Sequence, residues 1–204
     1  MDADRSDLCD AQFGERDNDV LALIGEEDLA TFSFDGLKRR LGLHPETLSR
    51  ILDRLEEEGI VKKGPSGYEV TSKISDLLPL PQTSNDGSRM PLLQTFLPSD
   101  VSIPCLISSL KGRWFASLRW LGLSDNGECV TLKWITEDDG IQISATISET
   151  ALTIEAKFLQ DRNLNVALKA SHQLLAHISG LCSRSQLLRR VAYFGNSDVY
   201  LTAA

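Results

Sequence analysis

The fold of the N-terminal part is decided by residues 32–70, which read FSFDGLKRRLGLHPETLSRILDRLEEEGIVKKGPSGYEV. Ser33 is a favourable N-cap for a helix with Leu37 and Leu41 on its buried face, and Gly42 is suited to end that helix. A second helix is expected to begin at His44-Pro45, because proline fits the first helical turn. Its apolar positions recur at spacings of three and four, at Leu48, Ile51, Leu52 and Leu55.

Sequence patterns on both sides of these two helices predict the remaining elements of a small domain. Before them, Val20, Leu21, Leu23 and Ile24 predict another helix, with Gly25 as its stop. After them, Gly59 ends the second helix, and a Gly64-Pro65-Ser66-Gly67 turn between short β-prone runs predicts a hairpin. Three helices followed by a hairpin predict a winged helix-turn-helix domain over residues 18–75.

This stretch resembles the winged helix-turn-helix of archaeal and bacterial transcription regulators of the broad MarR/ArsR-like kind. The resemblance covers about 55 of the 204 residues, and its most specific part is the LSRILDRLEEEGIV run of the second helix. It implies a winged-helix fold and DNA binding. Winged helices also serve as protein-docking modules, so a protein-interaction adaptor within a larger complex stays open as the alternative.

The expected DNA contacts follow from how a helix enters the major groove, with polar side chains near its N-terminus meeting base edges. The preceding helix crosses the phosphate backbone, and the hairpin touches phosphates or the minor groove. Alternatives remain for some positions: His44 as a helix-entry residue, Glu46 as a partner of the helix dipole, and the basic run as a solvated helix face. The predicted DNA-binding residues are Lys38, Arg39, Arg40, His44, Glu46, Thr47, Ser49, Arg50, Arg54, Lys62, Lys63, Ser66 and Tyr68.

The charge distribution keeps DNA binding possible despite a net charge of −8. Residues 1–30 carry 2 basic and 10 acidic groups, whereas residues 31–73 carry 8 basic and 7 acidic groups. Local charge decides whether a surface can meet phosphate. Residues 1–17 predict an acidic flexible tail, which is either a solubilising segment or an autoinhibitory mimic of DNA.

The remainder of the chain predicts an α+β domain. Residues 76–104 have the composition of a Pro-rich linker, although Leu92, Leu93, Phe96 and Leu97 suggest that part of it is anchored. Four strands are expected in an antiparallel meander, with a long helix over residues 163–182 covering it. The strand ranges are 113–121, 129–136, 141–148 and 152–158, and residues 198–202 suggest a short final strand. The domain is therefore placed at residues 105–204, for dimerisation or effector sensing.

The sequence lacks the usual signatures of catalysis and of cofactor or metal binding. The four cysteines stand singly, and His172 and His177 are five residues apart, so they do not share a helical face. No phosphate-binding or nucleophile motif is present, so no enzyme activity, cofactor or metal is expected. Trp114 and Trp120 are predicted to share one sheet face, as core aromatics or as the wall of an apolar pocket or dimer face.

Taken together, these features predict a cytoplasmic transcription regulator. Its partners would be double-stranded DNA, a second copy of the chain, and a small-molecule or protein effector. A homodimer is expected because DNA half-sites one helical turn apart demand two recognition helices on one face. The acidic N-terminus and the lack of a long apolar run give no sign of a signal peptide or membrane span.

Overall fold

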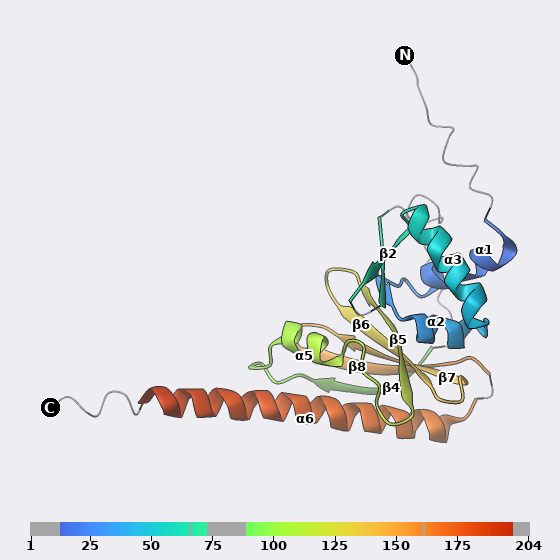
Figure 1. Ribbon diagram of the computed structural model, residues 1–204. Coiled ribbons are helices and arrows are strands. Elements are labelled where there is room, and N and C mark those ends of the chain that lie inside the picture. The colour runs from blue at the N-terminus through green and yellow to red at the C-terminus, as the bar shows by residue number, and fades with distance from the viewer. Residues whose placement is uncertain (1–12, 66, 73–88, 161, 198–204) are drawn as a thin grey trace, which may run out of the picture.

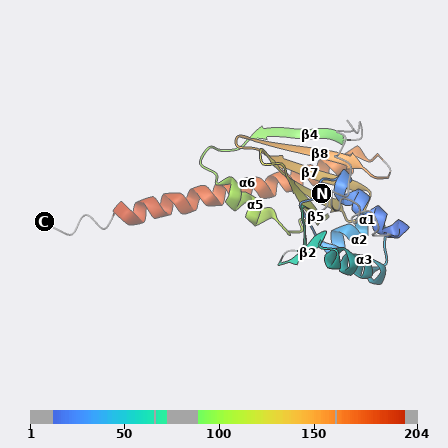
Figure 2. The same cartoon turned by 90° about the horizontal axis from the view of Figure 1, so that it is seen from above.

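The computed structural model (Figure 1) describes residues 13–65, 67–72, 89–160 and 162–197, with residues 184–197 described by their backbone alone. One large sheet runs through the molecule. The helices α5 and α6 lie on one side of it, and the N-terminal helices lie on the other (Figures 1 and 2). None of the helices within the described residues is both long and apolar enough to span a membrane.

The N-terminal part is a winged helix, as predicted. Its elements in chain order are α1 (Glu15–Glu26), β1 (Thr31–Phe32), α2 (Phe34–Leu41), α3 (Pro45–Glu57), β2 (Val61–Gly64) and β3 (Gly67–Val70). The predicted start and end of α2 are confirmed, because the Ser33 hydroxyl accepts from the Gly36 N–H at 3.0 Å and Gly42 is left-handed at φ 63°. Pro45 is the first residue of α3, and Gly59 follows that helix with φ 69°.

The limits of α1 differ from the expectation at both ends. Gly25 lies inside the helix, and the helix begins at Glu15, within the stretch predicted to be an acidic tail. Asp17 is buried in its first turn and accepts from the Gly14 N–H at 2.9 Å. Residues 1–12, which make up most of that predicted tail, lie outside the described residues.

Within its described residues, the C-terminal part contains five strands and two helices. They are β4 (Arg89–Phe96), α5 (Ile103–Leu110), β5 (Leu118–Asp125), β6 (Val130–Thr136), β7 (Ile141–Ile147), β8 (Ala151–Phe158) and α6 (Leu164–Ser197). All strand pairs are antiparallel, in the order β2-β3-β1-β5-β6-β7-β8-β4. The expected four-stranded meander is thus wrong in extent, because β5 to β8 are the middle of an eight-stranded sheet.

Two strands account for this difference. Residues 89–96 lie in the predicted Pro-rich linker, yet they form edge strand β4, where Pro91 sits beside an irregularity in the pairing with β8. Leu92, Leu93 and Leu97 pack against the core, so the expected anchoring is confirmed for them, whereas Phe96 is 85% exposed. The second strand, β1, has only two residues and leaves no periodic signal.

The sequence also misplaced the first strand of the meander and the end of the long helix. The strand begins at Leu118, so Trp114 precedes it and shares no sheet face with Trp120. Trp114 is 57% exposed, whereas Trp120 and Trp134 are buried with ring centroids 5.4 Å apart. Helix α6 continues beyond Cys182 to Ser197. The strand suggested for residues 198–202 lies outside the described residues.

The winged helix is joined to the sheet through β1. Phe32 pairs with Gly122 of β5, the Ser33 N–H donates to the Leu121 carbonyl at 2.8 Å, and the Ser33 hydroxyl donates to the Trp120 carbonyl at 2.8 Å. Gly36 in α2 allows this close approach, since a Cβ there would lie 2.5 Å from the Trp120 carbonyl oxygen. Each part keeps its own apolar core, but one hydrogen-bonded sheet connects them.

Candidate nucleic-acid interface

Helix α3 presents a polar face at its N-terminal end. Leu48, Ile51, Leu52 and Leu55 are fully buried and hold the helix to the domain. Among the predicted contact residues, His44, Glu46, Ser49 and Arg50 are exposed and Thr47 is half-buried. Figure 1 places α3 on the outer side of the winged helix, with α2 between it and the sheet. The N-terminal half of α3 is therefore accessible to a partner.

Arg50 is a highly exposed cation on this face, and it is paired with its helical neighbour Glu46. Its guanidinium lies 2.6 Å from the Glu46 carboxylate, and the two side chains are 72% and 66% exposed. Exposed pairs four residues apart contribute only about 0.3–0.5 kcal/mol. Arg50 can therefore exchange Glu46 for a phosphate or a guanine edge at little cost.

The wing supplies two more cations. Lys62 and Lys63 are exposed on β2, and the Lys63 N–H donates to the Glu56 carboxylate at 3.2 Å. Tyr68 on β3 is half-buried and stacks on Phe32 with ring centroids 5.6 Å apart. Burial and the nearby Asp53 and Glu56 raise the pKa of Tyr68, so its phenol stays protonated. Ser66 lies outside the described residues.

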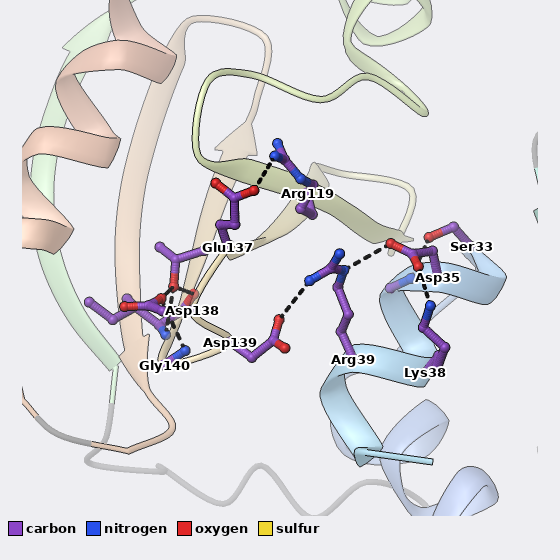
Figure 3. Close-up of polar contacts among 12 residues, drawn as sticks. Ser33, Asp35, Lys38, Arg39, Arg119, Glu137, Asp138, Asp139 and Gly140 are labelled. Carbon is purple, nitrogen blue, oxygen red and sulfur yellow. Dashed lines mark hydrogen bonds and ion pairs between the residues drawn. The ribbon is translucent and has the colours of Figure 1, made fainter. Parts of the chain in front are cut away.

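Carboxylates pair with two cations of the basic run of α2, Lys38 and Arg39 (Figure 3). Asp35 lies 2.7 Å from the Lys38 ammonium and 2.9 Å from Arg39 Nε. Arg39 also reaches Asp139 in the β6–β7 turn at 3.6 Å, which links α2 to the sheet. Burial by itself would raise the pKa of Asp35, but Lys38 and Arg39 lower it. The carboxylates of Asp35 and Asp139 in turn raise the pKa of Arg39. Arg40 is half-buried. Much of the positive charge expected on this helix is thus neutralised within the protein.

Arg54 is exposed, but it is also paired with a buried carboxylate of another helix. Its guanidinium lies 2.5 Å from the carboxylate of Asp17, whose side chain is only 4% exposed. The pair ties the second half of α3 to the first turn of α1. Arg54 lies one helical turn beyond Arg50 on the same side of α3, but its pair with Asp17 gives it a structural role that Arg50 does not have.

We expect Arg54→Ala to lower the free energy of unfolding by about 1–2 kcal/mol, because it leaves a buried carboxylate with one partner fewer. Arg50→Ala removes the same side chain from an exposed pair and should change stability by less than about 0.5 kcal/mol. Urea denaturation of both variants measures the difference. Equal stability of the two variants would contradict the structural role of Arg54.

A buried ionic cluster lies on the opposite side of the winged helix, at its junction with the sheet, and the sequence did not predict it. Glu27 caps the end of α1 and is fully buried. Its carboxylate accepts from Gln142 at 2.8 Å, from Lys157 at 2.9 Å and from Lys133 at 3.2 Å, and Arg89 lies 3.6 Å away. These partners come from β7, β8, β6 and β4, so one carboxylate joins α1 to four strands.

The electrostatics of this cluster favour the charged state of Glu27. Burial by itself would raise its pKa, but the charge of Lys133 and hydrogen bonds from Gln142 and Lys157 outweigh burial and lower the pKa to about 2. Burial lowers the pKa of Lys133, an effect that Glu27 opposes. Because three hydrogen-bond donors and the Arg89 guanidinium all converge on Glu27, the cluster ties the end of α1 to the sheet.

Within the described residues, no group of three or more His, Cys, Asp or Glu side chains is placed to hold a metal ion. The His177 ring instead contacts Phe115, with centroids 4.3 Å apart.

Comparison with known proteins supports the winged helix. Residues 17–66 match the model of the MarR family, which spans α1 from its third residue, α2, α3 and strand β2. No curated protein and no solved structure matches the chain. The match ends before β3, so the sheet and helices of the C-terminal part lie outside it. The region from residue 17 to residue 66 is therefore a MarR-like winged helix of the kind found in transcription regulators.

Proposed function

We propose that the protein is a DNA-binding transcription regulator of the cytoplasm that places the N-terminal half of α3 in the major groove. The observation that carries the proposal is the accessible polar face of α3 on a MarR-like winged helix. Arg50 reads a base edge or a phosphate, and His44, Glu46, Thr47 and Ser49 meet the groove beside it. Lys62 and Lys63 contact phosphates from the wing. In this arrangement Lys38 and Arg39 contribute less, because Asp35 and Asp139 already neutralise them.

The C-terminal part serves this function by dimerisation. Two copies would present two α3 helices to half-sites one turn apart, about 34–36 Å centre to centre. Effector sensing is the other role proposed for this part, and the connected sheet supports it. A change at β5 would reach the winged helix directly through the backbone pairing of β1.

The test is fluorescence anisotropy of the full chain with a labelled mixed-sequence duplex of about 30 base pairs. Binding at low salt is expected, and the logarithm of the affinity should fall linearly with the logarithm of salt concentration, with a slope near −0.9 for each neutralised phosphate. Enrichment of one sequence from a random pool would then identify the operator. Absence of binding at low salt would overturn the proposal.

The adaptor function has its own supporting observation, since internal ion pairs occupy two of the cations on α2. A pull-down from cell lysate, with and without nuclease, separates the two functions. Loss of partners after nuclease supports DNA binding, whereas partners that survive nuclease treatment, together with failed anisotropy, support an adaptor.

A further inference from the structure

Helix α6 is longer than the body that it covers. It has 34 residues and extends about 51 Å at 1.5 Å per residue. Its core residues are Ala167, Ala170, Leu174, Ile178 and Cys182. After Cys182 the helix continues for another fifteen residues, and its C-terminal part projects away from the sheet in both views (Figures 1 and 2).

The sequence of this projecting segment, residues 183–197, is SRSQLLRRVAYFGNS. Apolar residue types at 187, 188, 191 and 194 follow the spacing of a single helical face, and the segment contains no acidic residue. In proteins most helical stability comes from the packing of an amphipathic face rather than from helix propensity. We therefore expect residues 183–197 to pack against a partner surface.

An apolar groove lies beside the preceding turns of the same helix. It has a volume of about 790 Å³, and the segment between α5 and β5 forms one wall, with Trp114 and Phe115, while α6 forms the other, with Ala176, His177 and Leu181. Trp114 is the largest exposed apolar side chain at this groove. The Arg119 guanidinium lies 4.9 Å from its ring centroid and holds the ring in place.

Small residues on the α6 side of the groove leave room for another helix to approach. Ala176 is exposed, and Gly180 lies one turn further along the same face. A Cβ built on Gly180 meets no atom within 4 Å, so the space beside it is open. Small residues four positions apart let two helix backbones come close together.

We propose that this groove binds residues 183–197 of α6 from a second copy of the chain. The inference rests on the homodimer proposed above and specifies its interface. A two-fold axis near residues 182–183 would set the two α6 helices antiparallel, so that residues 173–181 of each copy face residues 184–192 of the other. Each copy then contributes both a groove and a projecting segment, as a closed two-fold dimer requires.

The groove cannot be filled by the same copy. Residues 183–197 continue the helix whose earlier turns form the groove wall, and a continuous helix does not fold back on itself. The segment carries apolar residue types at one helical spacing, and it lies on the same rigid element as the groove, so the two can meet only between two molecules.

Sedimentation equilibrium of the full chain tests this interface. The wild-type protein is expected to dimerise, and Gly180→Arg should raise the dimer dissociation constant at least about tenfold, since each dimer contains two altered sites. Ser179→Arg is the matched control, because Ser179 is exposed on a neighbouring face of the helix, and it should leave the dimer intact. Arginine favours a helix more than glycine does, so Gly180→Arg should not destabilise the monomer.

Tryptophan fluorescence provides a second measurement. Acrylamide quenching of the wild type should decrease as protein concentration rises and Trp114 becomes covered, and Trp114→Phe should abolish this change. A monomeric wild type at all concentrations, or a dimer that Gly180→Arg leaves unaffected, would overturn the interface. A dimer sensitive to Gly180→Arg that fails to bind DNA would overturn the proposed function and leave the interface standing.

Discussion

Replacement of Glu27 by alanine is expected to lower the free energy of unfolding by about 3–5 kcal/mol. The change removes from the buried Lys133 the carboxylate that pairs with it, and removes from the buried Lys157 one of its carboxylate partners. Buried charges without partners are among the most destabilising features in proteins, and a loss of this size is a large part of the usual total stability of roughly 5–15 kcal/mol. Chemical denaturation at pH 7 measures it.

Glu26→Ala is the matched control. Glu26 is the neighbouring residue and also contacts Lys157, at 2.6 Å, but its side chain is 52% exposed. We expect this variant to lose less than about 1 kcal/mol. Similar losses in the two variants would show that burial of the carboxylate is not what makes the cluster stabilising.

The pH dependence of stability provides an independent check on the same residue. The pKa of Glu27 is about 2 in the folded protein and 4.5 as an ordinary glutamate, so its contribution is complete above pH 4.5 and is lost as pH falls towards 2. The difference corresponds to about 3 kcal/mol. Glu27→Gln should remove this component from the acid limb of the stability curve. An unchanged acid limb would contradict the assignment.

The second large effect is expected in DNA binding. Replacing Arg50, Lys62 and Lys63 together by alanine should weaken binding to duplex DNA about 100-fold at low salt, because the change removes one groove contact and two phosphate contacts. The magnitude of the salt slope should fall by close to one unit for each phosphate that a copy of the variant no longer neutralises. Anisotropy titrations over a range of salt concentrations measure both quantities.

The control for this variant removes charge from the other part of the molecule. Arg162 and Lys169 are exposed near the start of α6, and their joint replacement by alanine matches the charge change of Lys62→Ala plus Lys63→Ala. The α6 variant should bind DNA much like the wild type. If the triple variant retained its affinity, the proposed interface of α3 and the wing would be wrong, even if the protein still bound DNA elsewhere.

Predictions from the sequence succeeded where the structural signal is local. The Ser33 cap, the left-handed Gly42, and the proline at the start of α3 each act within a few residues, and the apolar period of α3 directly reports its buried face. Turn residues and alternation were also enough to place β6, β7 and β8 within a residue or two. These features depend on neighbours along the chain, so the sequence displays them.

Predictions failed where a residue's partner lies far away along the chain. Strand β4 resembles a linker until its pairing with β8 is seen, and β1 has too few residues to show any period. Lys133 alternates with apolar residues as a solvent-facing lysine does, yet it meets Glu27 from 106 positions away. Lys38 and Arg39 belong to a basic run whose charge is cancelled partly by Asp139, on a turn about a hundred residues later.

The sequence by itself therefore determined that the chain carries a winged helix, because caps, glycine conformations and helical periodicity are local properties. The tertiary structure alone decided how that domain is held and which of its cations stay accessible. It joined the winged helix to an eight-stranded sheet through β1, anchored it with the buried Glu27, and left Arg50 and the wing lysines exposed at the proposed interface. Those outcomes depend on burial and charge pairing between distant segments, which become defined only when the chain is folded.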